Sequence, residues 1–302
     1  MKFKTVSIVI RVFNAEEDLK RCLRLLREQI LPIDTELEII IVDNESKDNS
    51  VLVSKEYGAK ITTISKSDFT WGRALNQGIS ISTGDIVLLL SADAYPADKK
   101  WIEHMINPFE DSSIAAVYGR QIPRDDAPID EVVRLHKYFP SVNRIFSKND
   151  SITQTGRGMI VSNACAAIRK SIWITRKYDE KVEGGEEGIW TYLALEEGYK
   201  SYYNSEARVY HSHNDPPPRR ALRQLELISK NASIQNSNFT KEVFKYPFVR
   251  LKKTIVNIRR VENHKKSKLV EILYFIPEIL LFYVFSLLWK TRYRTTLRKR
   301  FW

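Results

Sequence analysis

Two acidic residues lie just beyond the ends of short apolar runs, a position from which a carboxylate could bind a metal ion or a polar ligand. Asp93 comes after the run Ile86 to Leu90, and Asp43 comes after the run Leu37 to Val42. Such runs are typical of buried parallel strands, and ligands of open α/β sheets bind beyond the carboxyl ends of those strands. We therefore expect both carboxylates in one ligand site. For either residue alone, an acidic surface loop after a core strand is the simpler alternative.

A second acidic pair, Glu186 and Glu187, lies between glycines and Trp190 in the segment EGGEEGIW, residues 183 to 190. A carboxylate could serve here as the general base that takes the proton of an attacking hydroxyl group. Flanking glycines suit a tight turn at an active site. The alternative is structural, because acidic residues also stabilise the first turn of a helix, here one predicted over residues 189 to 197.

Two histidines, His211 and His213, follow Ala207 and Arg208, which we expect on an edge strand. At i and i+2 of an extended segment, the two side chains face the same side. They could then act on one ligand together, or they could merely be hydrogen-bonded near the strand end. The sequence leaves both interpretations open.

The elements that position these residues alternate between strands and helices. Val6 to Ile10 predicts a first strand, and Ile61 to Ile64 predicts a third, after the strand that ends at Asp43. Asn14 is predicted as the N-cap of the helix after the first strand, because acidic residues 16 to 18 would fill its first turn. This rhythm predicts an α/β fold with a doubly wound, mostly parallel sheet flanked by helices.

Six motifs in this chain, taken in order, resemble glycosyltransferase family 2, whose members are nucleotide-sugar enzymes with a GT-A fold. The resemblance covers about residues 5 to 215 and implies a catalytic, nucleotide-sugar-binding domain. The forms FTWGRALNQGI and VYHSH are similar to rhamnosyltransferase-type members, which implies a dTDP-linked deoxysugar as donor. The six motifs are SIVIRVFNAEEDLKRCL, EIIIVDNESKDNS, FTWGRALNQGI, STGDIVLLLSADAYP, NACAAIRKSIW and EGGEEGIW.

The resemblance also implies roles for individual residues. Asp43 would contact the nucleotide base, Arg73 the nucleotide or its diphosphate, and Glu187 would be the catalytic base. Glu187 stands where the family commonly has Asp, and its longer side chain keeps Glu186 in contention. The full set implied to bind the donor is Arg11, Asn14, Asp43, Arg73, Asn76, Ser91 and Asp93.

A divalent metal ion, Mn²⁺ or Mg²⁺, is implied as well, because the charge of the leaving diphosphate must be neutralised. The family's metal motif is usually Asp-x-Asp, whereas this chain has Ser91-Ala92-Asp93 and lacks the first carboxylate. Asp93 is therefore expected as a metal ligand, with His211 or His213 in place of the missing acid.

Length and cysteine content limit the class of protein. A chain of 302 residues can bury a full α/β core and still carry a C-terminal module. Only Cys22 and Cys165 are present, which excludes a disulfide framework and a cysteine-based zinc site and indicates a reducing compartment. The N-terminal apolar run is too short for a signal peptide. Pro216 to Pro218 suggests a boundary between a catalytic domain, residues 1–215, and a helical, basic module, residues 216–302.

The net charge of +11 is concentrated near the C-terminus. Residues 241–302 hold 16 basic and four acidic residues, whereas residues 1–240 hold 32 basic and 33 acidic ones. Between the basic blocks, residues 269–289 read LVEILYFIPEILLFYVFSLLW, too apolar for a solvated nucleic-acid arm. We favour a helix lying in the plane of an anionic membrane surface. A spanning helix and a packing or dimerisation helix are the alternatives.

These features predict a metal-dependent inverting glycosyltransferase with a glycan or lipid-linked acceptor in cell-surface polysaccharide synthesis. It would be cytoplasmic and peripheral at the inner face of the cell membrane, with a homodimer through the C-terminal module as a further option and no nucleic-acid partner. The alternatives are a membrane-tethered, non-catalytic nucleotide-sugar-binding protein on a transferase fold, and a nucleotidyltransferase. The nucleotidyltransferase would need a glycine-rich phosphate loop, which the sequence lacks.

Overall fold

The computed structural model describes residues 3–150, 161–182 and 184–213, together with the isolated residues Ala221, Pro277, Ile279, Leu280 and Phe282. The chain divides into two compact units: residues 1–122 with 136–211, and residues 123–135 with 212–302. Every predicted site residue except His213 belongs to the first unit. The predicted boundary after residue 215 stays a prediction.

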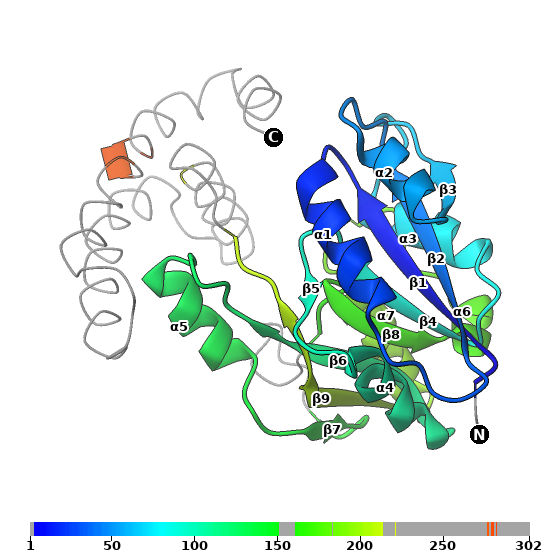
Figure 1. The fold of residues 1–302 in the computed structure, drawn as a ribbon. Coiled ribbons are helices and arrows are strands. Elements are labelled where there is room, and N and C mark those ends of the chain that lie inside the picture. Colours follow the sequence, from blue (N-terminus) through cyan, green and yellow to red (C-terminus); the bar gives the residue numbers. More distant parts are fainter. Residues whose placement is uncertain are drawn as a thin grey trace. The chain divides into compact units, whose positions relative to one another are not determined.

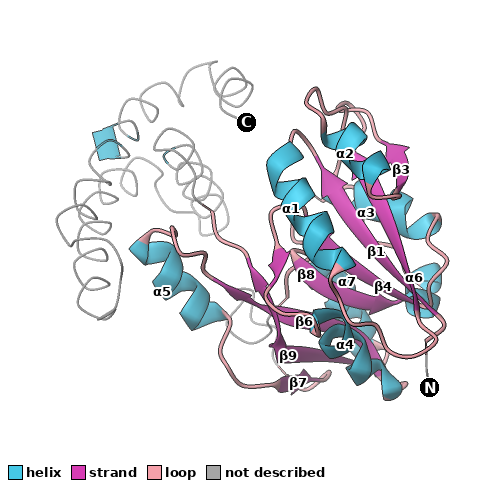
Figure 2. Ribbon diagram, viewed as in Figure 1, coloured by secondary structure: helices cyan, strands magenta, loops and turns pink. Residues whose placement is uncertain are grey.

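The nine described strands form one sheet, drawn in magenta in Figure 2. They are β1 (Thr5–Val12), β2 (Glu36–Asp43), β3 (Lys60–Thr63), β4 (Ile86–Ser91), β5 (Tyr95–Pro96), β6 (Ile114–Ile122), β7 (Arg144–Phe146), β8 (Cys165–Arg169) and β9 (Lys200–Tyr210). Their order is β3-β2-β1-β4-β8-β6-β9-β5, and β7 pairs with β9.

The predicted parallel sheet is present in the N-terminal half, where β1 to β4 run parallel to one another. In the second half, β8 is antiparallel to both β4 and β6, whereas β6 and β9 run parallel. The α/β class is confirmed. The predicted edge strand at Ala207 and Arg208 is wrong, because β9 pairs with β6 on one side and with β5 and β7 on the other. An apolar pattern alone does not show how many neighbours a strand has.

Helices cover both faces of the sheet (Figure 1). The described helices, in chain order, are α1 (Glu16–Arg27), α2 (Ser50–Glu56), α3 (Trp71–Ser80), α4 (Trp101–Ile106), the short 3₁₀ turn η1 (Asn107–Glu110), α5 (Ile129–Tyr138), α6 (Lys170–Thr175) and α7 (Glu186–Glu196).

Alternation along the central strands decides which face each side chain meets. Ile8 and Leu88 are fully buried in the main hydrophobic core, which also contains residues of α1, α2 and α4. Val9 points to the opposite face, where a Cβ added to Gly78 of α3 would lie 2.4 Å from it. Arg11 has the same parity as Val9. Its side chain therefore lies on the face that α3 covers.

Helix α1 is not capped by Asn14, contrary to the prediction. Its N-cap is Ala15, which has no side chain that could accept a hydrogen bond. The N–H of Ala15 donates to Oγ of Ser50, and the N–H of Glu16 donates to Oδ2 of Asp48, both at 3.0 Å. The cap thus comes from the loop after β2 and from the first residue of α2. Because it is remote in sequence, the local pattern could not reveal it.

The apolar segment 269–289 lies outside the described residues apart from four isolated positions, so its membrane and dimer interpretations stay predictions. Among the helices that the structure describes, none is both long enough and apolar enough to cross a bilayer.

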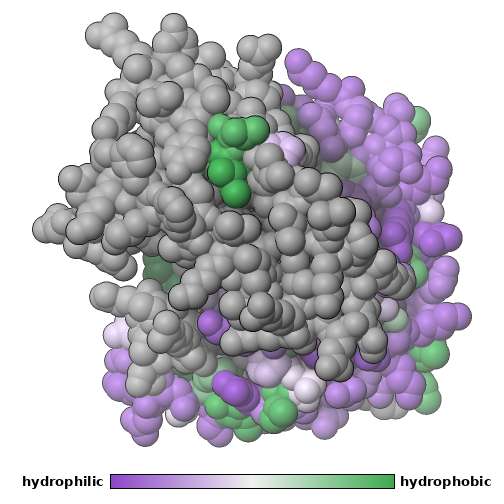
Figure 3. Space-filling view, turned by 90° about the vertical axis from the view of Figure 1, so that its left-hand side faces the viewer, coloured by the Kyte–Doolittle hydropathy of each residue, from purple (hydrophilic) through white to green (hydrophobic). Residues whose placement is uncertain are grey.

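In the second unit, the N–H of Arg124 donates to Oγ of Ser212 at 3.2 Å. The described surface visible in Figure 3 is mainly hydrophilic, with hydrophobic residues in small groups.

Candidate active site

Three parallel strands deliver predicted site residues to the same edge of the sheet. Arg11 of β1 lies opposite Val42 of β2 and Ser91 of β4. Asp43 is the last residue of β2, and Asp93 follows β4 by two residues. Both carboxylates therefore lie at the carboxyl edge, where ligands of such sheets bind.

Asp43 and Asn14 hold the loops at this edge in place. Asp43 is only 3% exposed, and its Oδ2 accepts the N–H of Ser46 at 3.2 Å. Asn14 has φ 48°, and its Oδ1 accepts the N–H of Lys47 at 2.7 Å. The two side chains thus fix the backbone of the loops after β1 and β2. Their direct contact with a donor stays a prediction.

Arg11 is the central cation of this site. Its guanidinium lies 4.6 Å from the centroid of the Trp71 ring, and its Nη1 lies 3.6 Å from Oε1 of Glu186. The side chain is 11% exposed, and burial lowers the pKa of Arg11. Among the described residues, none accepts a hydrogen bond from Nη1. A buried cation with an unused N–H suits an anionic ligand oxygen.

Glu186 and Glu187 are the first two residues of α7, which begins three residues earlier than predicted. Gly185 precedes them at φ 86°, a left-handed conformation that favours glycine. Glu186 is 4% exposed, and it accepts a hydrogen bond from Nδ2 of Asn163 at 3.3 Å besides pairing with Arg11. The structural alternative for this pair, stabilisation of acidic residues by the dipole at the start of a helix, therefore applies to α7 in addition to the ion pair.

The surroundings of the two carboxylates differ. Burial raises the pKa of Glu187, and the neighbouring charge of Glu186 raises it further. Hydrogen bonds from backbone N–H groups and the charge of Arg11 oppose this shift only in part. Two acids in unlike environments are typical of a site in which one acts as a base and the other stays ion-paired.

His211 and Asp93 form the second polar group of the site. Nδ1 of His211 lies 2.8 Å from Oε1 of Gln121, and Nε2 lies 3.5 Å from Oδ1 of Asp93. With Nδ1–H donating to Gln121, the lone pair of Nε2 would face the carboxylate. His213 belongs to the second unit, where its N–H donates to Oε1 of Glu131 at 3.4 Å.

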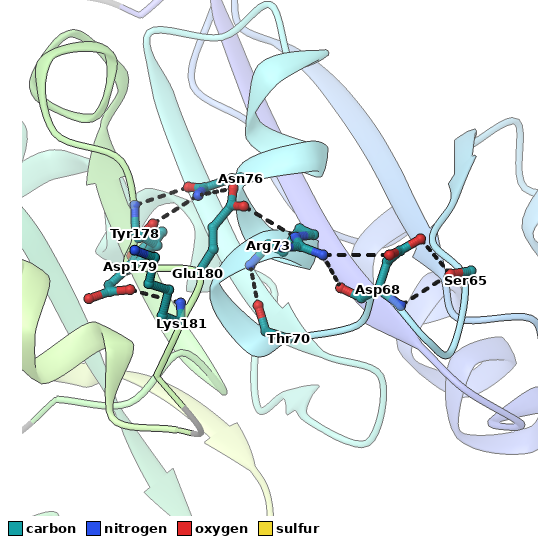
Figure 4. Close-up of polar contacts among 9 residues, drawn as sticks. All are labelled: Ser65, Asp68, Thr70, Arg73, Asn76, Tyr178, Asp179, Glu180 and Lys181. Atoms are coloured by element: carbon teal, nitrogen blue, oxygen red, sulfur yellow. Dashed lines mark hydrogen bonds and ion pairs between the residues drawn. The ribbon is translucent and has the colours of Figure 1, made fainter.

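Arg73 and Asn76 of α3 are engaged by protein atoms (Figure 4). Nε of Arg73 lies 3.2 Å from Oε2 of Glu180. Asn76 is 6% exposed; its Nδ2 donates to Glu180 and to the Tyr178 carbonyl, and its Oδ1 accepts from Tyr178 N–H and Trp173 Nε1. These contacts give Asn76 a structural role, and its contact with a donor stays a prediction.

Sequence reasoning missed several residues of this arrangement. Trp71 and Asn163 lie inside motifs that carried the family resemblance, so their presence could have been noticed. Gln121 and Glu180 had no such signal, because each acts through a residue distant in sequence, at 90 and 104 positions respectively.

Comparison with known proteins decides the family. Residues 7–175 match the sequence model of the family described as Glycosyl transferase family 2. The chain belongs to this family. This membership is the one that the motifs predicted.

Two rhamnosyltransferases illustrate the relationship. The chain is 31% identical over 182 residues to the O-antigen chain rhamnosyltransferase WbaN of Salmonella anatum. This alignment covers 60% of the chain and 58% of WbaN. It is 30% identical over 215 residues to the O-antigen chain rhamnosyltransferase RfbN of Salmonella typhimurium strain LT2, which covers 70% of this chain and 68% of RfbN. The chain thus matches little more than half the length of WbaN.

The fold is shared with solved transferases. Mannosyltransferase PcManGT from Pyrobaculum calidifontis, in complex with GDP-Man and Mn²⁺, has a TM-score of 0.55 at 14% identity. The match covers 98% of this chain and 83% of that chain. At this identity the similarity shows the fold alone, and it confirms the predicted GT-A-like architecture.

Proposed function

We propose that this member of glycosyl transferase family 2 moves a deoxyhexosyl residue from a nucleotide-diphosphate donor to a glycan or lipid-linked acceptor in cell-surface polysaccharide synthesis, such as that of O-antigen. The two rhamnosyltransferase relatives support this sugar class and this process. The observation that carries the proposal is the acidic pair of α7, in which Arg11 pairs with Glu186 while Glu187 has a raised pKa.

In the proposed reaction, the acceptor hydroxyl attacks the anomeric carbon while Glu187 takes the hydroxyl proton. The bond between this carbon and the diphosphate oxygen breaks, and the nucleoside diphosphate leaves. A single displacement of this kind inverts the anomeric centre. A raised pKa brings the basicity of Glu187 closer to neutral pH, where a general base is most effective. Glu186 is less available for the proton because Arg11 pairs with it.

The proposed donor contacts lie around the carboxyl edge of β1, β2 and β4. Asp43 and Asn14 support the base-binding loops, and Ser91 lies beside Arg11 in the sheet register. The unused Nη1–H of Arg11 suits an oxygen of the diphosphate. Arg73, whose side chain is 43% exposed despite its ion pairs, could reach the donor from the rim.

The side-chain oxygen and nitrogen atoms near Asp93 fit the ligands of a divalent metal ion. A carboxylate oxygen and an imidazole Nε2 face each other there, and Gln121 holds the opposite ring nitrogen. We propose Asp93 and His211 as ligands. His213, two residues further along the chain, is proposed as the third ligand because the family resemblance implies a histidine in this stretch. Mn²⁺ or Mg²⁺, when bound, would neutralise charge on the leaving diphosphate.

We also propose peripheral association with the cytoplasmic face of an anionic membrane through residues 241–302. The support is compositional, since residues 241–302 carry a net charge of +12 and all of their basic residues lie outside the apolar segment 269–289. Apolar insertion and attraction to anionic lipids would add, at about 1 kcal/mol for each basic side chain near the surface.

The test compares Glu187→Gln with Glu186→Gln in a transfer assay. We expect Glu187→Gln to lower kcat by about 10² to 10⁴ with little change in donor affinity, because it deletes the base and keeps the shape. If only Glu186→Gln lost activity, the base would be Glu186. If both variants kept their activity, the two glutamates would have only a structural role in the first turn of α7.

Donor binding is tested separately by thermal stabilisation of the full chain with dTDP-, UDP- and GDP-sugars, each with and without Mn²⁺. A bound donor raises the melting temperature by mass action. The absence of stabilisation by every nucleotide sugar would overturn the donor assignment. Stabilisation without transfer would favour the non-catalytic binding protein.

A further inference from the structure

The segment between α6 and α7 is irregular in backbone but buried at its centre. Tyr178 is 2% exposed, although residues 177–179 belong to no helix or strand. This segment leads directly to the acidic pair of α7. Its attachments therefore decide where α7 begins.

On one side, the segment is attached to α3. Asn76 receives the Tyr178 N–H on its Oδ1 at 3.0 Å and donates from Nδ2 to the Tyr178 carbonyl at 2.9 Å. The backbone also approaches the first turn of α3 closely, because a Cβ added to Gly72 would lie 2.1 Å from the carbonyl oxygen of Asp179. Gly72 therefore permits a contact that a larger residue would prevent.

Glu180 fastens this attachment with both of its carboxylate oxygens (Figure 4). Oε1 accepts from Nδ2 of Asn76 at 2.9 Å, and Oε2 accepts from Nε of Arg73 at 3.2 Å. Arg73 is itself held by the carbonyl of Asp68, to which Nη1 donates at 2.9 Å. One side chain thus connects the start of α3 to the segment before α7.

On the other side, the same segment is attached to α7. Nε1 of Trp190 donates to the carbonyl of Arg176 at 2.6 Å, and the rings of Tyr178 and Trp190 lie 5.7 Å apart. The hydroxyl of Tyr178 donates to Oδ1 of Asn163 at 3.5 Å, and Asn163 in turn donates to Glu186. A displacement at Glu180 would therefore be transmitted to the first turn of α7.

We propose that Glu180 is a positioning residue for the reaction: it holds the segment 176–180 between α3 and α7 and so fixes the place of the Glu187 carboxylate. The inference rests on the proposed function of Glu187 as the base. A base displaced by about 1 Å can lose up to about 10²-fold in rate. In this role Glu180 would act through Arg73 and Asn76 and not by contact with the substrate.

The experiment uses Glu180→Ala and Glu180→Gln, with Glu196→Gln as the matched control. Glu196 pairs with Lys148 at 2.9 Å near the end of α7, and its side chain is 39% exposed against 40% for Glu180. We expect Glu180→Ala to lower kcat about tenfold while the donor KM changes less than twofold. Glu180→Gln keeps an acceptor for Asn76, so it should recover part of the rate.

Hydrogen exchange of α7 amides in the substrate-free protein gives a readout that needs no activity. We expect faster exchange across residues 186–196 in Glu180→Ala and wild-type exchange in Glu196→Gln. An unchanged kcat, or a raised donor KM with full kcat, would overturn the proposal, the latter by making Glu180 part of the donor site. If the wild-type protein showed no transfer activity, the proposed function alone would be refuted. If hydrogen exchange of the α7 amides were unchanged in Glu180→Ala, the positioning role alone would be refuted.

Discussion

Replacing Asn76 with alanine would show how far this amide holds the site together. The substitution removes the hydrogen-bond partners of three groups: the backbone N–H of Tyr178, its backbone carbonyl, and Nε1 of Trp173. Tyr178 and Trp173 are 2% and 4% exposed, so water reaches these groups poorly. Three unsatisfied groups at about 1 to 2 kcal/mol each predict a loss of roughly 3 to 6 kcal/mol in the free energy of unfolding.

Urea unfolding and thermal unfolding would both measure this loss. For a unit of this size, about 2 to 4 °C per kcal/mol predicts a melting temperature lower by roughly 6 to 24 °C. Ser80→Ala is the control on the same helix, because Ser80 is exposed and its Oγ donates to the Gln77 carbonyl of the same helix. This variant should stay within about 0.5 kcal/mol of wild type. The reasoning fails if Asn76→Ala unfolds like wild type and instead raises the donor KM.

Three further outcomes are expected. Gly72→Ala should destabilise the protein by about 1 to 3 kcal/mol because its Cβ would meet the Asp179 carbonyl, whereas Gly188→Ala, with open space at its Cβ, should be neutral or stabilising in the same unfolding assay. Glu186→Gln removes a charge that raises the pKa of Glu187, so the acidic limb of the kcat profile should move to lower pH; a limb that moved up or stayed would contradict the assignment. Asp93→Ala and His211→Ala should each lose the Mn²⁺-dependent rise in melting temperature, whereas the surface variant His136→Ala should retain it.

The strands and the family were predictable because their signals are local or ordered along the chain. Apolar runs located β1, β2 and β4 to within one or two residues, and motif order indicated glycosyl transfer before any geometry was known. Asp43 and Asp93 were expected at one edge of the sheet because parallel strands must end together. The antiparallel insertion of β8 was not predicted, since pairing direction leaves little trace in composition.

Contacts made across long sequence separations escaped prediction. The stacking of Arg11 on Trp71, the pairing of Arg11 with Glu186 and the hold of Gln121 on His211 each depend on how layers pack. The parity of Arg11 with Val9 was readable, but the helix that would cover that face was not. Most of the polar residues of the candidate site could therefore be predicted from the sequence. Which of them are held by protein atoms could be seen only in the fold.

The reciprocal capping of the loops after β1 and β2 has a consequence for engineering donor preference. Ser50 and Asp48 satisfy backbone donors of residues 15 and 16, and Asn14 satisfies that of Lys47 in return. A chimera that imports only one of these loops from a relative would leave the other loop's N–H groups without their acceptors. Segments 13–16 and 43–50 must therefore be exchanged together if their proposed role in nucleotide preference is to be tested with the fold intact.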